Sequence, residues 1–564
     1  MKRTLFGLAI WPLLAWGQKP VINPGGVVNA ASYATGLEID SSGTVFTTLP
    51  GGSIATIFGT NLAASTQSAQ SAPLPRQLAG TAVSVDGIAA PLFYVSPTQI
   101  NFQMPSSNDT TPGISAATGI VVGTAAGLSD PYVTVITGLS AVPGIFSMSA
   151  NGCGQGAVLN VSADGSTSLN SPTNSATPGD YISIYGTGNG DVYNQPPDGV
   201  PAPSSPLATA QIDSFPLFDY DGAGGGGFWT GRAPGFVGLD QFNFQVPETA
   251  RQGCAVPLQI VNGNVSAPVT ISIASGGGTC VDPPTQGYGE ILWEKTVTTT
   301  VGLTTTVTEN DTLTVSLQAS PGRQAPTPPV FSEGGLLPPA FTYYGPSCPI
   351  PGYRSLGAGT VTIQGPGLAA TPAPATPLQG GTILAVLPLP GNGFNPVPAF
   401  QSGQVSGLTV YQATLPSGTI QQGSFKVSAS GGSDVGAFQS TVQIGSPIQI
   451  QTALADRLLS AGQSYTITWT GGDSNSWVTV KLVSHEGAYD YYPWAWEARA
   501  SDESITITGQ EPGESFGSGG PLEMVIEVVP DSSQVPALSA PGLSLGGLHL
   551  WKYTYRFEGL TAQN

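Results

Sequence analysis

Alternation of apolar and polar residues over short runs is the dominant pattern of this chain. The apolar residues Ile100, Phe102 and Met104 alternate with polar ones, and a period of two is typical of a strand that is buried on one face. Runs of this kind recur along most of the chain and end at glycine, proline, asparagine or aspartate. Sustained helical periodicity is nearly absent. The pattern therefore predicts an all-β protein made of many short strands.

Two strings of sequence occur twice, in the same order. Val95–Pro105 (VSPTQINFQMP) is echoed by Val237–Pro247 (VGLDQFNFQVP), and the predicted strand 54–58 is echoed by 181–185. Linked strings that repeat in the same order indicate a duplicated module. Each copy offers about seven short strands in roughly 120 residues, which is typical of an immunoglobulin-like (Ig-like) sandwich.

Glycine marks several of the predicted strand ends. Gly59 and Gly186 follow the equivalent strands of the two copies, so we expect a backbone requirement at this point rather than chemistry. Asp86-Gly87 lies between two alternating runs, and this dipeptide predicts a tight hairpin.

The same pattern divides the rest of the chain. After a linker at 281–288 we expect two further β-sandwich modules, so that the fold is a tandem array of about four Ig-like domains. The expected modules are module 1 at 24–150, module 2 at 151–280, module 3 at 289–446 with a proline-rich insertion at 321–352, and module 4 at 447–564.

The N-terminus resembles a cleaved signal peptide. Lys2 and Arg3 precede the apolar run Leu5–Leu14, and Ala15-Trp16-Gly17 places small residues where a signal peptidase cuts. We therefore expect residues 1–17 to be removed before Gln18. No later stretch approaches 18 uninterrupted apolar residues, so a transmembrane segment is not expected in the mature chain. The predicted location is secreted, either extracellular or at the cell surface.

Composition narrows the class of partner. Only 9% of the 564 residues are charged, and 15 Lys and Arg against 34 Asp and Glu leave a net charge of −19. A nucleic-acid partner is excluded because binding it requires a basic surface. The partner is expected to be a protein or a glycan, which the composition does not identify.

Several linked strings resemble a family of uncharacterised secreted proteins of Acidobacteria, the Solibacter-type C-terminal domain. The resemblance covers about residues 24–275 and implies paired Ig-like domains in an exported protein, with no known activity or catalytic residue. The strings are Gly26–Tyr33, Phe58–Ala63, Pro73–Pro75, VSPTQINFQMP, Tyr185–Gly188 and Ala233–Leu239.

The four cysteines favour disulfides in an exported protein. Cys254 and Cys280 flank one predicted hairpin and are the expected pair, which leaves Cys153 and Cys348 as the second pair. No CxxC occurs and the chain has only two histidines, so a zinc site is not expected.

The best candidate for ligand binding is an aromatic cluster near the C-terminus. Its members are Tyr489, Tyr491, Tyr492, Trp494 and Trp496, with Pro493 among them. Flat aromatic faces stack on sugar rings, and exposed apolar patches are often interaction sites. Packing in a core or between domains is the alternative. Pro493 indicates an edge strand or a loop.

Catalytic and metal motifs are weak. Gly513–Gly517 matches the nucleophile elbow around Ser515, and Asp531 and His549 follow in hydrolase order, but glycine and proline on both sides make this a loop. The acidic residues have no spacing that singles out a pair for glycoside hydrolysis. Asp219, Asp221 and the loop 188–191 suggest calcium, but neither has a known calcium-site spacing. No catalytic residue, metal site or cofactor is therefore expected.

The predicted function is accordingly that of an exported, non-catalytic array of β-sandwiches with a structural or adhesive role. The first alternative is a carbohydrate-binding protein that uses the aromatic cluster at 489–496. The second alternative is a secreted hydrolase.

Overall fold

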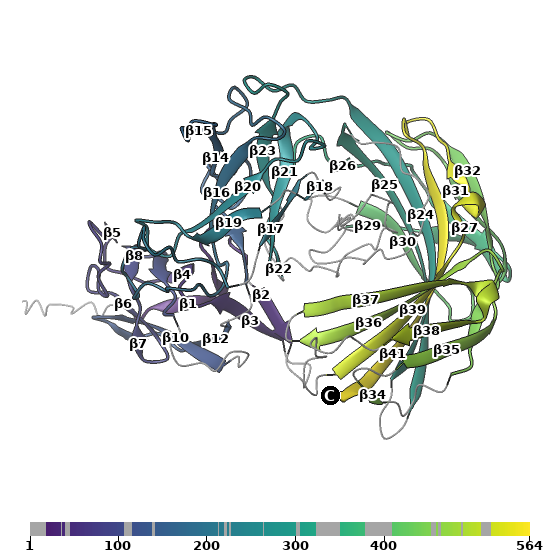
Figure 1. Cartoon of the computed structure of the whole chain (residues 1–564), viewed down its shortest axis with the longest axis horizontal. Helices are drawn as coiled ribbons and strands as arrows, with labels where there is room; N and C mark the ends of the chain where they lie inside the picture. The colour runs from purple at the N-terminus through teal and green to yellow at the C-terminus, as the bar shows by residue number, and fades with distance from the viewer. Residues whose placement is uncertain are drawn as a thin grey trace, which may run out of the picture.

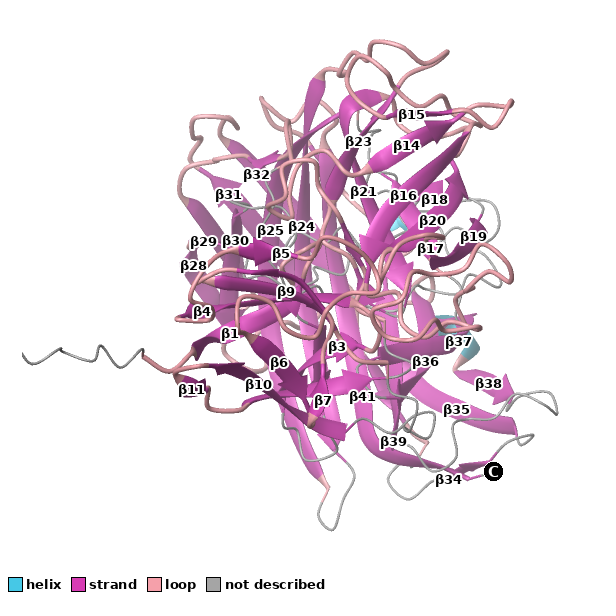
Figure 2. Ribbon diagram, turned by 90° about the vertical axis from the view of Figure 1, so that its left-hand side faces the viewer, coloured by secondary structure: helices cyan, strands magenta, loops and turns pink. Residues whose placement is uncertain are grey.

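The computed structural model consists almost entirely of β-strands (Figures 1 and 2). Its described part contains no α-helix, only the short 3-10 helices η2 (Ala500–Asp502) and η3 (Ser532–Gln534). No helix in this part is long and apolar enough to cross a bilayer. The structure describes residues 18–563 except 35, 40–44, 107–115, 138–140, 212–213, 219–222, 225–226, 263, 301–304, 323–349, 378–408, 453–457, 461–463, 487–488 and 509–520. The predicted signal peptide and most of the proline-rich insertion lie outside the described residues.

Module 1 is a two-layer sandwich. Ile57 and Phe102 of one sheet and Val83 and Val122 of the other are fully buried in one core, as the alternation of their strands requires. The first sheet has the order β1 (Val21–Asn29), β4 (Ile54–Thr60), β9 (Gln99–Gln103), β8 (Leu92–Val95), β5 (Gln67–Ser68). The second has β2 (Gly36–Ile39), β3 (Val45–Pro50), β12 (Tyr132–Thr137), β10 (Ala116–Thr124), β6 (Ala82–Val85), β7 (Ile88–Ala89), with β11 (Gly127–Leu128) beside β10.

Module 2 has the same plan, and its two sheets share a core that contains Ile184, Phe244 and Ile260. One sheet has the order β15 (Thr167–Leu169), β14 (Val158–Val161), β16 (Tyr181–Thr187), β20 (Asp240–Gln245), β19 (Gly227–Arg232), with β13 (Gly144–Ile145) beside β16. The other has β18 (Ala223–Gly224), β17 (Phe215–Phe218), β21 (Gly253–Asn262), β22 (Asn264–Val265), with β23 (Val269–Ile273) beside β21. Because β13 already belongs to module 2, the boundary lies before residue 144 rather than at 150.

The duplicated strings occupy equivalent strands in the same register. Ile57 lies opposite Ile100 in module 1, and Ile184 lies opposite Phe242 in module 2. The polar face repeats as well. The Thr56 hydroxyl donates to Asn101 Oδ1 (3.1 Å), and the Ser183 hydroxyl donates to Asn243 Oδ1 (2.8 Å). In each copy a neighbouring glutamine amide also donates to that asparagine, at 2.9 and 3.0 Å.

The glycines that end the equivalent strands are required by close approach of another strand. A Cβ on Gly59 would collide with the carbonyl oxygen of Val21, and a Cβ on Gly186 with that of Gly144. The Asp86-Gly87 hairpin also forms, with both residues at positive φ (48° and 82°) between β6 and β7, as a two-residue turn of this kind requires.

The C-terminal half differs from the two separate modules that were expected. Strands from 289–446 and from 447–564 join in one eleven-stranded sheet, because β24 (Thr285–Thr300) pairs in parallel with β41 (Gly547–Gln563). The strand β24 also takes in part of the expected linker. The main order is β29 (Ala375–Pro377), β30 (Thr409–Leu415), β25 (Thr306–Pro321), β24, β41, β39 (Pro521–Val529), β36 (Trp477–Glu486), β37 (Tyr489–Arg499). The short strands β26 (Arg354–Ser355), β34 (Leu458–Ser460) and β40 (Ala537–Leu538) join at the side.

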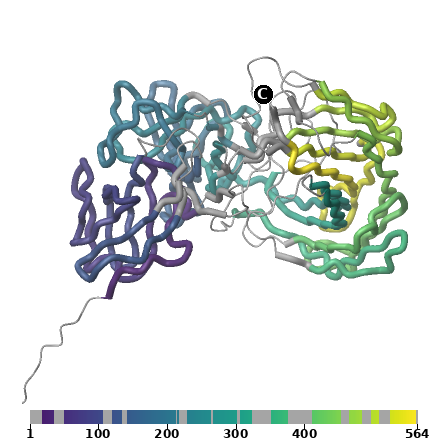
Figure 3. The backbone as a smooth tube through the Cα atoms, turned by 90° about the horizontal axis from the view of Figure 1, so that it is seen from below, coloured from purple at the N-terminus to yellow at the C-terminus, as the bar shows by residue number. Residues whose placement is uncertain are grey.

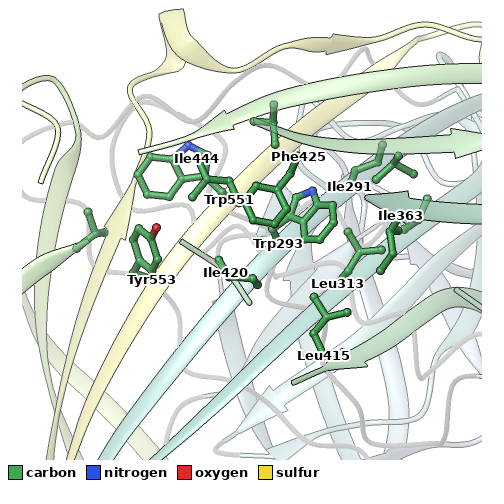
Figure 4. Close-up of a cluster of buried hydrophobic side chains, with 14 of the residues drawn as sticks. Ile291, Trp293, Leu313, Ile363, Leu415, Ile420, Phe425, Ile444, Trp551 and Tyr553 are labelled. Atoms are coloured by element: carbon green, nitrogen blue, oxygen red, sulfur yellow. The ribbon is translucent and has the colours of Figure 1, made fainter. Parts of the chain in front are cut away.

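Two smaller sheets pack on one face of this large sheet and share a single core with it. Trp293, Trp551 and Tyr553 of the large sheet meet Phe425 of a smaller one (Figure 4). One small sheet has the order β28 (Leu368–Ala373), β27 (Val361–Gly365), β31 (Gly423–Ala429), β32 (Phe438–Ile444), and the other has β33 (Ile448–Ile450), β35 (Ser464–Gly471), β38 (Ser504–Thr508). Each expected sandwich therefore exists, but the two are fused through a common layer. Figure 3 shows this half beside the two N-terminal modules.

Alanine at Gly59 or Gly186 is expected to lower the free energy of unfolding by about 1–3 kcal/mol, because the added methyl forces two strands apart. Urea unfolding of the full chain measures the loss. Gly119→Ala in β10 is the matched control, since a Cβ there has no neighbour closer than 3.8 Å. Equal stability of all three variants would contradict the close-approach explanation.

Candidate functional site

The aromatic cluster expected to bind a ligand lies on β37, the last strand in the order of the large sheet. This edge position agrees with the presence of Pro493 in the strand. Trp496 lies opposite the buried Val480 and packs, half-buried, against the hydrophobic core. The side chains of Tyr489, Tyr491, Tyr492 and Trp494 lie outside the described residues. The one described ring of the cluster therefore has a packing role.

The two described residues of the elbow motif, Asp531 and His549, are hydrogen-bonded to other residues and not to each other. Ser515 lies outside the described residues, and Asp531 accepts hydrogen bonds from Arg499 Nη1 (2.7 Å) and the Ser533 hydroxyl (2.7 Å). These bonds, with the Arg499 hydrogen bond the largest cause, lower the pKa of Asp531 to about 2. An acidic group held this way is part of a surface ion pair.

His549 is a buried structural residue. The Trp293 indole N–H donates to its Nε2 (2.9 Å), and its Nδ1 lies 2.7 Å from the Ser440 hydroxyl. Since an indole N–H only donates, Nε2 is unprotonated and Nδ1 carries the proton of the neutral ring. Burial lowers the pKa of His549 to about 3. The ring therefore has no free nitrogen with which to act as a base toward Ser440 or another serine.

The expected calcium and disulfide residues have mixed outcomes. Asp219 and Asp221 lie outside the described residues, and in the described part no three His, Cys, Asp or Glu side chains are placed to hold a metal.

Cys254 and Cys280 are joined by a disulfide, the pair chosen from the sequence. Cys153 is also disulfide-bonded. Its expected partner, Cys348, lies outside the described residues.

Sequence reasoning missed a buried ion pair at the junction of modules 1 and 2. Arg232 and Asp240, opposite each other on β19 and β20, are 1% and 0% exposed and form a salt bridge through Nη1 and Oδ1. Arg232 Nη2 also donates to the carbonyl oxygens of Gly51 in module 1 (3.3 Å) and Gly190 in module 2 (3.1 Å). Burial raises the pKa of Asp240, against the opposing charge of Arg232. The 188–191 loop suggested for calcium is thus part of this network, since Asn189 N donates to Asp240 Oδ2 (2.8 Å).

Further buried hydrogen bonds cross the same junction. Asn29 Nδ2 donates to the carbonyl oxygens of Val142 (2.9 Å) and Thr187 (3.0 Å). The backbone N–H of Ile54 donates to Thr187 Oγ1 (2.8 Å), and that of Gly199 to Gln103 Oε1 (2.6 Å). Directional bonds of this number fix how the two sandwiches sit against each other.

The large sheet carries a second feature that sequence reasoning missed, a charged inner face. We use this name for the side away from the two small sheets, which Figure 1 shows turned toward the N-terminal modules. Lys481 bonds Glu527, while Lys552 contacts Glu294 (2.9 Å) and Glu527 (3.6 Å). Arg556 pairs with Glu523 at 2.7 Å. The charged residues of the inner face include Glu294, Lys481, Glu497, Glu523, Glu527, Lys552 and Arg556.

The two glutamates that flank Thr479 differ in their electrostatics. Thr479 lies opposite Glu497 on one side and Glu527 on the other. Burial alone raises the pKa of Glu527, but Lys481 and Lys552 lower it to about 2. Burial raises the pKa of Glu497 to about 7, and Lys481 opposes this only in part. Glu497 is thus the carboxyl of the inner face whose charge is poorly compensated.

Comparison with known proteins does not assign the chain to a family. No protein-family model matches the chain, and no curated protein matches it. Among solved structures the chain is similar to the plexin A4 extracellular region (9% identity, 87% of this chain and 30% of that one, TM-score 0.13). It is also similar to chicken CNTN1 domains FN1–FN3 (9%, 72% and 96%, 0.14) and to the eight N-terminal Ig domains of DSCAM (11%, 90% and 48%, 0.12). The chain spans less than a third of the plexin region and about half of the DSCAM region. TM-scores this low carry no argument about function.

The raised pKa of Glu497 predicts a pH-dependent stability. Its protonated form is favoured in the folded state, so its contribution is fully present below about pH 4.5 and is lost as the pH rises through about 7. Urea unfolding at several pH values should show that the free energy of unfolding of Glu497→Gln rises relative to that of the wild type as the pH increases from 5 to 8. The control is Glu503→Gln, which changes an exposed carboxylate in the same C-terminal half of the chain. A constant difference between wild type and Glu497→Gln across this range would contradict the prediction.

Proposed function

We propose that the protein is an exported, non-catalytic array of β-sandwich domains that serves as a structural or adhesive element at the cell surface or in the extracellular space. The observation that carries this proposal is how rigidly the domains are joined. Modules 1 and 2 share a buried polar junction around Arg232, and the two C-terminal sandwiches share one sheet. Such joints suit a spacer that holds binding surfaces at fixed positions.

Other features support an extracellular location. The chain contains disulfide bonds, which persist in oxidising compartments, and its first 17 residues have the sequence features of a signal peptide. The resemblance to secreted acidobacterial proteins supports the same location. Neither alternative function gains a specific observation here, because Trp496 packs against the core and both nitrogens of His549 have partners.

The joint between modules 1 and 2 is tested by Arg232→Met, which leaves Asp240 buried without its counter-charge. The loss of unfolding free energy should be about 3–5 kcal/mol, because an uncompensated buried charge is costly. Small-angle X-ray scattering of the full-length Arg232→Met variant should show a broader pair-distance distribution than that of the wild type. The double variant Arg232→Met/Asp240→Leu should recover most of the stability, since a buried ion pair and an apolar pair are often similar in stability.

The cellular role is tested in the native host. We expect the protein in the surface or extracellular fraction with Gln18 as its first residue, and we expect cells lacking it to adhere less. Wild-type protein should restore adhesion, and Arg232→Met should restore it less at equal surface abundance. Retention in the cytoplasm, or unchanged adhesion of the deletion strain, would contradict the proposal.

A further inference from the structure

Thr479, on β36 between β39 and β37, has an unused hydrogen-bonding group on the charged inner face. The residue is 1% exposed, and its hydroxyl has no hydrogen-bond partner in the described part of the chain. Leaving a buried hydroxyl unpaired costs about 1–3 kcal/mol. Its neighbours across the strands, Glu497 and Glu527, have longer side chains, so the hydroxyl lies closer to the sheet than their carboxyl groups.

Glu497 is the second group there without a direct partner. It is half-buried on β37, and among the described residues it makes no ion pair or hydrogen bond, although Lys481 acts on it electrostatically. The carboxylates of Glu294, Glu523 and Glu527 are each in contact with a cation, as in the pairs of Glu523 with Arg556 and Glu294 with Lys552. The unused hydrogen-bonding capacity of the face is therefore concentrated at two adjacent positions.

These two positions suit a ligand with hydroxyl groups. A hydroxyl both donates and accepts hydrogen bonds, so one group can accept from Thr479 while donating to Glu497. An ammonium group can only donate, so it leaves the hydroxyl donor of Thr479 unused, and an ionised carboxylate ligand can only accept, so it offers no donor to an ionised Glu497. The two groups lie on neighbouring strands, whose spacing is about 4.8 Å, so adjacent hydroxyls of one ligand reach both.

The charge of the surrounding face also favours a neutral ligand. Glutamates alternate with Lys481, Lys552 and Arg556 across the strands, so the signs of charge on the inner face are interleaved. A cationic ligand meets Lys481 beside Glu497, and an anionic ligand meets the carboxylates on either side of Thr479. Interleaved carboxylates and ammonium groups offer acceptors and donors to a polyol in alternation.

We propose that Thr479 and Glu497 form the centre of a binding site for a neutral carbohydrate on the inner face of the large sheet. This site differs in position and chemistry from the aromatic cluster, because it uses hydrogen bonds from the inner face rather than stacking on aromatic rings. It goes beyond the proposed structural role, which does not depend on it.

The test is isothermal titration calorimetry of the full mature chain with laminarihexaose, cellohexaose, xylohexaose and maltohexaose. At least one of these should bind. Thr479→Val and Glu497→Leu, which remove the hydroxyl and the carboxyl acceptor, should each weaken its binding by about tenfold, the effect of one lost hydrogen bond in a desolvated site. Thr479→Ser, which keeps the hydroxyl, should bind nearly as the wild type does.

Two measurements guard against misfolding. The thermal midpoint of Thr479→Val should equal or exceed that of the wild type, because valine removes an unpaired buried hydroxyl. Thr506→Val, the same substitution on the exposed face of β38, should leave binding unchanged. The proposal is overturned if none of the four sugars binds at millimolar concentration, or if Thr479→Val and Glu497→Leu bind as the wild type does. Binding of only spermidine or oligogalacturonate, or loss of sugar binding in Tyr491→Ala alone, also overturns it.

Discussion

The parallel pairing of β24 with β41 is the interaction on which the C-terminal half depends. It runs from Gly289 opposite Gly547 to Thr300 opposite Glu558, and it places Trp293 opposite Trp551. On one side this pairing brings the two small sheets onto a single core. On the other it aligns Glu294 with Lys552 and so begins the charged inner face. Without it, the two sandwiches would be separate domains and each would have a free sheet edge.

The local parts of the fold were predictable because they depend on neighbouring residues. Alternation assigned Ile100, Phe102 and Met104 to one buried face, and the repeated strings paired the right strands of the two copies. The fusion of the two C-terminal sandwiches was not predictable in this way. Alternation tells which residues share a face but not which strand lies alongside, and the partner of β24 is at the far end of the chain.

The candidate sites show the same limit. Cys254 and Cys280 were chosen correctly because one hairpin links them. The inner face was missed because Lys481 and Glu527 alternate with apolar residues, a pattern that ordinarily places them in water. In the structure both are largely buried. The aromatic cluster was conspicuous in the sequence, yet its described member Trp496 fills the core, since rings are useful as packing material wherever a sheet must be covered.

Buried charge in this protein has a positioning role. The chain has only 15 Lys and Arg, yet Arg232, Lys481 and Lys552 are all buried beside carboxylates. Desolvation offsets much of the attraction within such pairs, so their net contribution to stability is small. These pairs do fix the relative position of the strands that carry them, because a misplaced pair leaves a buried charge unpaired. At the module junction this fixes one domain against the next. On the inner face it holds Lys481, Lys552 and Arg556 against their carboxylates and leaves Glu497 without an ion pair among the described residues, so that the direction of the neighbouring groups is set before any ligand arrives.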